Sequence, residues 1–360
     1  MTATTTISGV RARPVLLPLA RPLRTASGSV PAAPLILIDV TTEDGVVGHS
    51  YVFGYTEAVL AAMLALVTDI APALVGKPAV PAQWMRESQD RFRLLGMQGL
   101  LGMVVSGIET AIWDALGKVT GQAVVTLLGG EPRPLRAYDS YGLVDPQHDK
   151  EALRKSVEDG FRGIKIKVGG SDVAKDVAVV RQVREIIGSD VALMVDYNQS
   201  LDPAEACRRI ERLREFDLYW VEEPVAAEDL AGHALVRRSA GVPVQSGENW
   251  WFPRGFQQAF TAGASDFVMF DVVKIGGVTG WMLAAGQAEA ASVRVSSHLF
   301  VETSAHVLPV TPTADWLEYL DLASPVLLDP VRPVGGLVTA SGPGLGITWN
   351  EDAIERYAVR

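Results

Sequence analysis

The chain has 360 residues, of which 48% are hydrophobic and 21% charged, the composition of a folded protein of about two domains. This balance excludes an intrinsically disordered chain, a collagen and a coiled coil. Acidic residues outnumber basic ones by 42 to 32, and the net charge of −10 argues against nucleic acid and anionic membranes as partners.

The first residues and the single cysteine bear on location. Residues 1–10 lack the cationic start and apolar stretch of a signal peptide, so we expect none. The longest apolar helical candidate, residues 58–67, is shorter than the ~20 residues needed to span a bilayer. Cys207 has no cysteine to pair with, which suits a reducing compartment. These features predict a cytoplasmic protein.

Residues 1–125 are predicted to form an α+β domain. Strand-like runs at 7–17, 35–40 and 46–52 favour an antiparallel meander with a turn at Asp44-Gly45. Helical patterns follow at 57–74, 83–95 and 101–118, and Gly121 ends the last of them. Residues 20–34, between the first two strands, are too long for a tight turn. This segment is either a substrate lid or an idle surface loop.

From about residue 130 strands alternate with helices, which is typical of parallel βαβ units. The strand-like segments are 136–140, 163–168, 192–196, 218–222, 242–246, 267–270, 293–297 and, weakly, 316–318. Eight units within residues 130–324 predict a TIM barrel, and the poor last unit favours a (β/α)7β variant. Residues 325–360 show no helical period and are expected to return to the first domain. The predicted fold is an α/β barrel with an α+β N-terminal capping domain.

Polar residues stand at the ends of the predicted barrel strands. Because the carboxyl ends of these strands face one mouth, their side chains converge on one site. In chain order they are Lys165 and Lys167, Asp196 with Asn198, Glu222, Glu248, Asp271, His298 and Glu318. Each alone is better explained as a loop-end cap or a surface charge. The regular step of about one βα unit across the set predicts an active site.

Three carboxylates, Asp196, Glu222 and Glu248, end adjacent strands. Oxygen ligands without cysteine or histidine favour magnesium, or manganese, over zinc. Such a cluster can instead pair with lysine and arginine. Since uncompensated carboxylates repel one another, a divalent cation is the simpler explanation. Glu223 is expected to point away from Glu222 by strand alternation.

Two candidate bases accompany the carboxylates. Lys165 and Lys167 leave one face of their strand, so each ammonium should depress the other's pKa and leave one neutral near pH 7. Asp271 and His298 come from neighbouring strands, and a carboxylate bonded to the imidazole would make a second base. The simpler alternatives are a surface lysine pair and a satisfied core histidine.

Two bases on opposite sides of a barrel mouth suit removal of a proton from either face of one carbon. The cation would bind the carboxylate next to that carbon and stabilise the enediolate. We therefore expect a small-molecule carboxylate as substrate.

Longer stretches relate the sequence to a known family. They are VVGHSY (46–51), WDALGK (113–118), VDYNQS (195–200), VEEP (221–224), GENW (247–250), KIGGVTGW (274–281), SSHLF (296–300) and TADWLE (313–318). Over essentially the whole chain the sequence resembles the enolase superfamily, and within it the mandelate racemase subgroup. Lysine pairs and acidic ligands belong to the wider superfamily, whereas the long runs are specific to this branch.

The resemblance implies a magnesium site and two assigned bases. The ligands would be Asp196, Glu222 and Glu248. Lys167 would be one base, and His298, paired with Asp271, the other. The subgroup further implies racemisation of a 2-hydroxy acid, a lid supplied by the first domain, and a homo-oligomer, by resemblance an octamer.

The resemblance also assigns the substrate contacts. Lys165 would bind the substrate carboxylate beside the metal, and Glu318, as a protonated acid, would donate to its opposite oxygen. Asn198 would contact the α-hydroxyl, and Ser140, at the end of the first barrel strand, the carboxylate.

The lid departs from the subgroup's apolar pattern. Leu23, Ser27 and Val30 fall at its substrate-facing positions, with Arg24 between them. Leu23 and Val30 favour an aryl 2-hydroxy acid. Ser27 and an inward Arg24 would suit a polyol, so dehydration of an acid sugar, with His298 as the general acid, is the alternative. A metal-binding scaffold without turnover is disfavoured because no base or ligand is missing.

Overall fold

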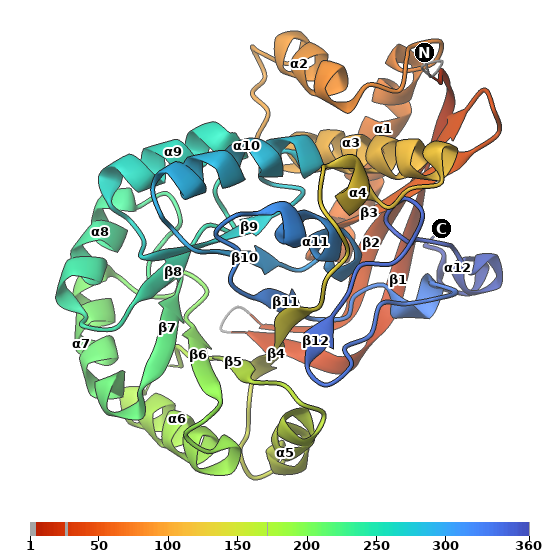
Figure 1. The fold of residues 1–360 in the computed structure, drawn as a ribbon. Helices are drawn as coiled ribbons and strands as arrows, with labels where there is room; N and C mark the ends of the chain where they lie inside the picture. Colours follow the sequence, from red (N-terminus) through yellow and green to blue (C-terminus); the bar gives the residue numbers. More distant parts are fainter. Residues whose placement is uncertain (1–4, 26–27, 171, 360) are drawn as a thin grey trace.

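The structure is a computed structural model that describes residues 5–25, 28–170 and 172–359. An N-terminal antiparallel sheet with its helices lies beside a parallel barrel (Figure 1). The end of its longest hairpin reaches the barrel mouth, where it lines a pocket together with barrel residues.

The N-terminal sheet has the order β1-β2-β3, and both neighbouring pairs are antiparallel. Its strands are β1 (Ile7–Thr25), β2 (Gly28–Thr42) and β3 (Val47–Phe53). Residues 35–38 of the central strand β2 are buried on both faces, which explains their unbroken apolar run. Gly45, with φ of 77°, lies in the turn before β3. The predicted meander is confirmed.

The described part of the segment predicted as a loop, residues 20–25 and 28–34, is instead the far end of the β1–β2 hairpin. After an irregularity between Pro18 and Leu23, the strands pair again through Leu23 opposite Val30 and Thr25 opposite Gly28. The prolines that suggested a loop are tolerated because β1 is an edge strand, and β3 pairs with β2 only from Leu35 onward. The structure gives an extended two-stranded arm rather than an irregular loop.

Helices cover the N-terminal sheet. They are η1 (Glu57–Val59), α1 (Leu60–Ile70), η2 (Ala71–Ala73), α2 (Pro81–Arg91), α3 (Leu100–Thr120) and α4 (Val124–Leu127). A Cβ on Gly48 of β3 would lie 2.1 Å from the Ala111 carbonyl oxygen, so α3 packs directly on the strand. Gly121 ends α3 in the left-handed conformation, as predicted.

The longest apolar helix is α3, not residues 58–67 as expected from the sequence. By length and composition α3 is able to cross a membrane, but 83% of its apolar window is buried inside the protein. Buried core helices meet the same criterion, so the observation is weak evidence for a span.

The barrel confirms the predicted fold class. Its strands are β4 (Leu135–Leu143), β5 (Gly163–Lys167), β6 (Ala192–Asp196), β7 (Leu218–Glu222), β8 (Val244–Ser246), β9 (Phe267–Asp271), β10 (Val295–His298) and β11 (Leu317–Tyr319). Neighbouring strands are parallel in the order β10-β9-β8-β7-β6-β5-β4-β11. The Ser297 amide donates to the Trp316 carbonyl at 3.0 Å and joins β10 to the segment before β11.

Helices on the outside separate successive strands (Figure 1). They are α5 (Lys150–Glu158), α6 (Val173–Ile187), α7 (Pro203–Leu213) with η3 (Arg214–Phe216), α8 (Leu230–Ser239), α9 (Phe252–Ala262), α10 (Gly277–Ala290), and α11 (Val301–Val307) with η4 (Leu308–Val310). Buried Tyr138, Met194, Trp220 and Trp316 fill the barrel interior, so side chains at the strand ends stand on a packed floor.

The C-terminal segment contains η5 (Ser324–Val326), β12 (Leu337–Val338) and α12 (Glu351–Tyr357). Helix α12, which the sequence did not predict, is a short helix capped by the Asn350 side chain. β12 pairs antiparallel with β4. At the end of the chain, Val359 donates from its amide to the Pro14 carbonyl of β1 at 3.1 Å.

Candidate active site

Strand register brings the predicted polar residues to one mouth of the barrel. Lys167 on β5 lies opposite Asp196 on β6, and Asp196 lies opposite Glu222 on β7. His298 on β10 lies opposite Asp271 on β9. Parallel pairing thus sets Lys167, Asp196 and Glu222 side by side on three adjacent strands, and Asp271 beside His298 on two others.

Glu248 reaches this mouth from a tight turn after β8. Gly247 precedes it with φ of 134°, and a Cβ there would lie 2.5 Å from the Met269 carbonyl oxygen of β9. Only glycine fits both this conformation and this close approach. The glycine therefore allows the carboxylate of Glu248 to turn into the pocket.

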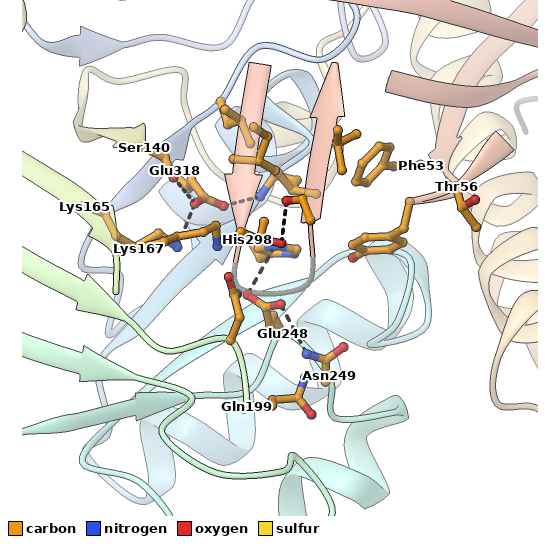
Figure 2. Close-up of a pocket in the computed structure, with 18 of the residues that line it drawn as sticks. Phe53, Thr56, Ser140, Lys165, Lys167, Gln199, Glu248, Asn249, His298 and Glu318 are labelled. Carbon is orange, nitrogen blue, oxygen red and sulfur yellow. Dashed lines mark hydrogen bonds and ion pairs between the residues drawn. The ribbon is translucent and has the colours of Figure 1, made fainter. Parts of the chain in front are cut away.

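The mouth opens into a pocket of about 600 Å³ (Figure 2). Its lining residues come from the hairpin, from the segment after β3, and from the barrel strand ends: Leu23, Thr25, Gly28, Ser29, Val30, Phe53, Tyr55, Thr56, Ser140, Lys165, Lys167, Asn198, Gln199, Glu248, Asn249, Lys274, His298, Leu299, Glu318 and Leu320. The pocket thus combines charged groups on the barrel side with apolar and uncharged polar groups on the capping side.

The two lysines are held by carboxylates rather than by mutual repulsion. Lys165 Nζ lies 2.6 Å from Glu222 Oε1 and 2.8 Å from Glu318 Oε1, and Lys167 pairs with Asp196. Burial alone would lower both pKa values, but these carboxylates raise the pKa of Lys165 well above its usual range and also raise that of Lys167. The expectation of a depressed lysine pKa is therefore wrong for this arrangement.

His298 and Asp271 form a buried hydrogen-bonded dyad. Nδ1 of His298 lies 2.8 Å from Asp271 Oδ2, and Oδ1 of Asp271 accepts from the amides of Val273 and Lys274. Nε2 of His298 faces Glu248 Oε2 at 3.3 Å. Although burial lowers it, the pKa of His298 is raised by the carboxylates of Glu248, Glu318 and Asp271. The imidazole is therefore oriented by one carboxylate and faces the pocket beside another.

Glu318 is surrounded by donors in this arrangement, which favours its ionised form. Its oxygens accept from the Ser140 hydroxyl at 2.8 Å and from the Leu299 amide at 2.9 Å, in addition to the Lys165 ion pair. Despite burial, Lys165 and His298 lower the pKa of Glu318 to about 2. Ser140 is thereby placed beside Glu318, within the pocket.

The three predicted ligands, Asp196, Glu222 and Glu248, are buried at the same mouth. Within the described ranges no three acidic, histidine or cysteine side chains are already clustered as a metal site, and the three carboxylates are instead paired with Lys165, Lys167 and His298. Burial, together with repulsion from Asp196 and Glu248, raises the pKa of Glu222 to about 8 even though Lys165 lowers it.

One orphaned polar atom bears on a cation. The backbone amide of Asn198 donates to Asp196 Oδ1 at 2.7 Å, and its side-chain Nδ2 donates to Asp196 Oδ2 at 2.8 Å. The Oδ1 atom of Asn198 is buried without a hydrogen-bond partner. The donor set at this mouth is thus three carboxylates and a free carbonyl-type oxygen. Such hard oxygen donors fit magnesium or manganese.

Family models match both parts of the chain. Residues 7–129 match the mandelate racemase / muconate lactonizing enzyme N-terminal domain, and residues 148–353 match the enolase C-terminal domain-like family. The chain belongs to the mandelate racemase / muconate lactonizing enzyme family. The enolase-superfamily resemblance seen in the sequence is confirmed.

Relatives of this family member differ in reaction. An enolase from Bradyrhizobium, crystallised with magnesium and mandelic acid, is 55% identical over 100% of both chains, with a TM-score of 0.98. D-galactarolactone cycloisomerase of Agrobacterium fabrum is 31% identical and covers 98% of both chains. L-talarate/galactarate dehydratase of Salmonella typhimurium, liganded with magnesium and L-lyxarohydroxamate, is 26% identical over 99% of this chain and 94% of its own, with a TM-score of 0.92.

The hairpin end that reaches the pocket is partly apolar. Leu23 and Val30 face the pocket from paired positions on the hairpin. Arg24 points elsewhere, because its guanidinium pairs with Asp149 at 3.1 Å and does not line the pocket. Ser27 lies outside the described residues.

Several pocket residues escaped sequence reasoning. Phe53 and Tyr55 come from the other domain, and no strand-end rule could find them. Lys274 and Asn249 each follow a predicted strand end, which was the available signal. Glu223 leaves β7 with φ of 37° and accepts from Asn249; burial and nearby Glu248 raise its pKa well above the usual range.

Proposed function

We propose that this protein is a magnesium-dependent racemase of 2-hydroxy acids with an aryl or similarly apolar side chain. One observation supports this most directly: Lys167 and His298 line the same pocket as the apolar hairpin residues Leu23 and Val30. The mandelic acid held by the Bradyrhizobium relative is a ligand of this class. The proposal joins two bases to an apolar wall.

Asp196, Glu222 and Glu248 would hold the cation, with the free Oδ1 of Asn198 close by. When bound, magnesium supplies positive charge that balances these carboxylates and polarises a substrate carboxylate. Manganese would serve in the same way, because the oxygen donors do not discriminate sharply between the two.

The lysine pair then has two separate tasks. Lys165 would turn from Glu222 and Glu318 to the substrate carboxylate, since its ammonium needs a negative partner in a buried site. Glu318, relieved of that ion pair, would have the raised pKa of a buried carboxyl and could donate a hydrogen bond to the same substrate carboxylate. Ser140, already bonded to Glu318, would complete this contact.

Lys167 and His298 would exchange the α-proton on opposite faces. β5 and β10 are separated by β4 and β11 on one side and by β6 to β9 on the other, so their ends lie across the mouth from each other. If Asp196 binds the cation, the Lys167 ammonium loses its ion pair, so burial would lower its pKa and Lys167 could act as a base. Asp271 fixes the imidazole so that Nε2 of His298 faces the pocket.

Dehydration of an acid sugar is the second candidate. Gln199, Asn249 and Lys274 form a polar wall of the pocket that would suit hydroxyl groups. The outward direction of Arg24 removes one feature that favoured this function.

Chiral chromatography of each mandelate enantiomer, incubated with protein and magnesium, tests the proposal. We expect both enantiomers to interconvert, and no 2-keto acid to form from a panel of acid sugars. The absence of racemisation together with keto acid formation from any acid sugar would replace the racemase by the dehydratase.

A further inference from the structure

A part-buried hydrogen-bond chain adjoins the predicted metal ligand Glu248, whose contact with Asn249 is drawn in Figure 2. Lys274 Nζ donates to Asn249 Oδ1 at 2.6 Å. The Asn249 amide nitrogen in turn lies 3.0 and 2.9 Å from the two oxygens of Glu223 and 3.2 Å from Glu248 Oε1. One amide group therefore connects a lysine to two carboxylates.

The lysine determines which way this amide points. An ammonium can only donate, so the oxygen of Asn249 must face Lys274 and its NH2 group must face the carboxylates. With the amide reversed, Oδ1 would face the oxygens of Glu223 and Oε1 of Glu248, and these oxygens would lose the Asn249 donor. The interaction of Lys274 with Asn249 is thus what presents a donor to Glu248.

The same lysine is also tied to the base dyad. Its backbone amide donates to Asp271 Oδ1 at 3.1 Å, while Oδ2 of that residue holds His298. Its carbonyl accepts from the Phe252 amide at 3.0 Å, which anchors the turn after β9 to the start of α9. Lys274 is 5% exposed, and its ammonium lies 4.7 Å from the centroid of the Tyr55 ring.

We propose that Lys274 is a positioning residue that, through Asn249, fixes the carboxylate of Glu248 for cation binding and ties it to the Asp271–His298 dyad. This inference rests on the proposed function, because it takes Glu248 as a ligand. Partners of metal ligands typically change metal affinity by ~10–100-fold when removed. Electrostatics alone predicts the opposite sign, since deleting a nearby positive charge should strengthen cation binding.

Titration of the full-length metal-free protein with Mn²⁺, with free Mn²⁺ followed by electron paramagnetic resonance, shows whether removing Lys274 weakens or strengthens cation binding. Lys274→Met, which keeps the length but not the donor, should weaken Mn²⁺ binding by roughly 10–100-fold. Asn249→Ala should weaken it similarly, and the double variant should be no weaker than the more affected single one, because the two act in one chain. Lys274→Arg, which keeps a donor, should restore part of the affinity.

Exposed Lys175 supplies the control, since Lys175→Met removes a charge away from the pocket and should leave Mn²⁺ binding unchanged. Unchanged or tighter binding by both Lys274→Met and Asn249→Ala would overturn the inference. So would a raised KM for mandelate with unaltered Mn²⁺ affinity, which would make Lys274 a substrate contact. If Lys274→Met does not fold, Asn249→Ala decides alone. Failure of the unmodified protein to bind Mn²⁺ would instead contradict the proposed function.

Discussion

The barrel mouth and the hairpin that reaches it are built in opposite ways. At the mouth, adjacent parallel strands fix buried charges to one another, as Lys167 is fixed to Asp196 and His298 to Asp271. Near its end the hairpin is a two-stranded arm that lines the pocket with apolar Leu23 and Val30 and with polar Thr25 and Ser29. The difference suggests that the chemistry depends on rigid strand register, whereas the choice of side chain depends on an arm that tolerates change.

Removing the cation should inactivate the site at the barrel mouth, and this is the largest effect on activity that we expect. Without it, the carboxylates of Asp196 and Glu222 remain engaged with the lysines, so neither lysine is available to the substrate. Exhaustive chelation should abolish mandelate racemisation, and added magnesium should restore it. Full activity in the chelated protein, verified metal-free by elemental analysis, would show that the metal assignment is wrong.

Replacing each base in turn should show which enantiomer it deprotonates. His298→Asn should slow α-proton exchange with solvent for one enantiomer by ~10²–10⁴-fold, and Lys167→Arg should do so for the other. Exchange into deuterated water, followed by NMR for each enantiomer separately, is the measurement. Equal loss from both enantiomers in both variants would contradict opposed bases.

These expectations show what the sequence could and could not predict. The strand-end residues were found because parallel strands repeat at nearly constant spacing, and the structure places Lys167, Asp196 and His298 at one mouth. Their catalytic roles stay predictions. The pKa direction predicted for Lys165 and Lys167 was wrong, because it depends on which carboxylate each ammonium meets, and residue spacing does not contain that information.

Other pocket residues could not be predicted from the sequence, because their positions depend on contacts between the domains or on the backbone conformation of turns. Tyr55 enters the pocket from the other domain. Asn249 and Glu223 lie in turns, where positive φ values such as the 37° of Glu223 redirect side chains away from strand alternation. The prolines of the hairpin led to the prediction of a loop, but an edge strand tolerates proline because some of its backbone N–H groups have no strand partner.

Glu109 allows a test of the contact between the N-terminal domain and the barrel. This α3 residue accepts from the Val278 and Thr279 amides at the start of α10, each at 2.9 Å, and burial raises its pKa to about 7. A raised carboxyl pKa means that the folded state binds the extra proton, so this contribution to stability is lost as pH rises from about 4.5 to 7.

Glu109→Gln should therefore flatten the decline of the free energy of unfolding over this pH window. The same variant should cost ~1–3 kcal/mol at pH 7, because one acceptor oxygen becomes an NH2 group that faces donors. Urea unfolding at several pH values measures both effects, and exposed Glu57→Gln is the control. An unchanged pH slope would contradict the titration assigned to Glu109.

The smallest effect is expected from the hairpin. Val30→Ser should lower kcat/KM for mandelate by roughly tenfold, because a lost apolar contact of this size costs ~1–2 kcal/mol. Ser27→Val should raise it by a similar factor if that residue meets the aryl ring. Steady-state kinetics with both enantiomers measure the change. A gain for mandelate with Val30→Ser would mean that the arm does not select an apolar side chain.

The contact between the end of the chain and β1 has a consequence for biosynthesis. Val15 of β1 forms a bridge with Ala358, and Trp349 donates to Asp39 of β2 at 2.7 Å, so residues made after the barrel contact the first two strands. While the ribosome is still adding the barrel, the outer edge of β1 has no such cover and offers free backbone groups to other chains. Synthesis rate and chaperone access, rather than final stability, would then govern how much of the nascent protein escapes aggregation.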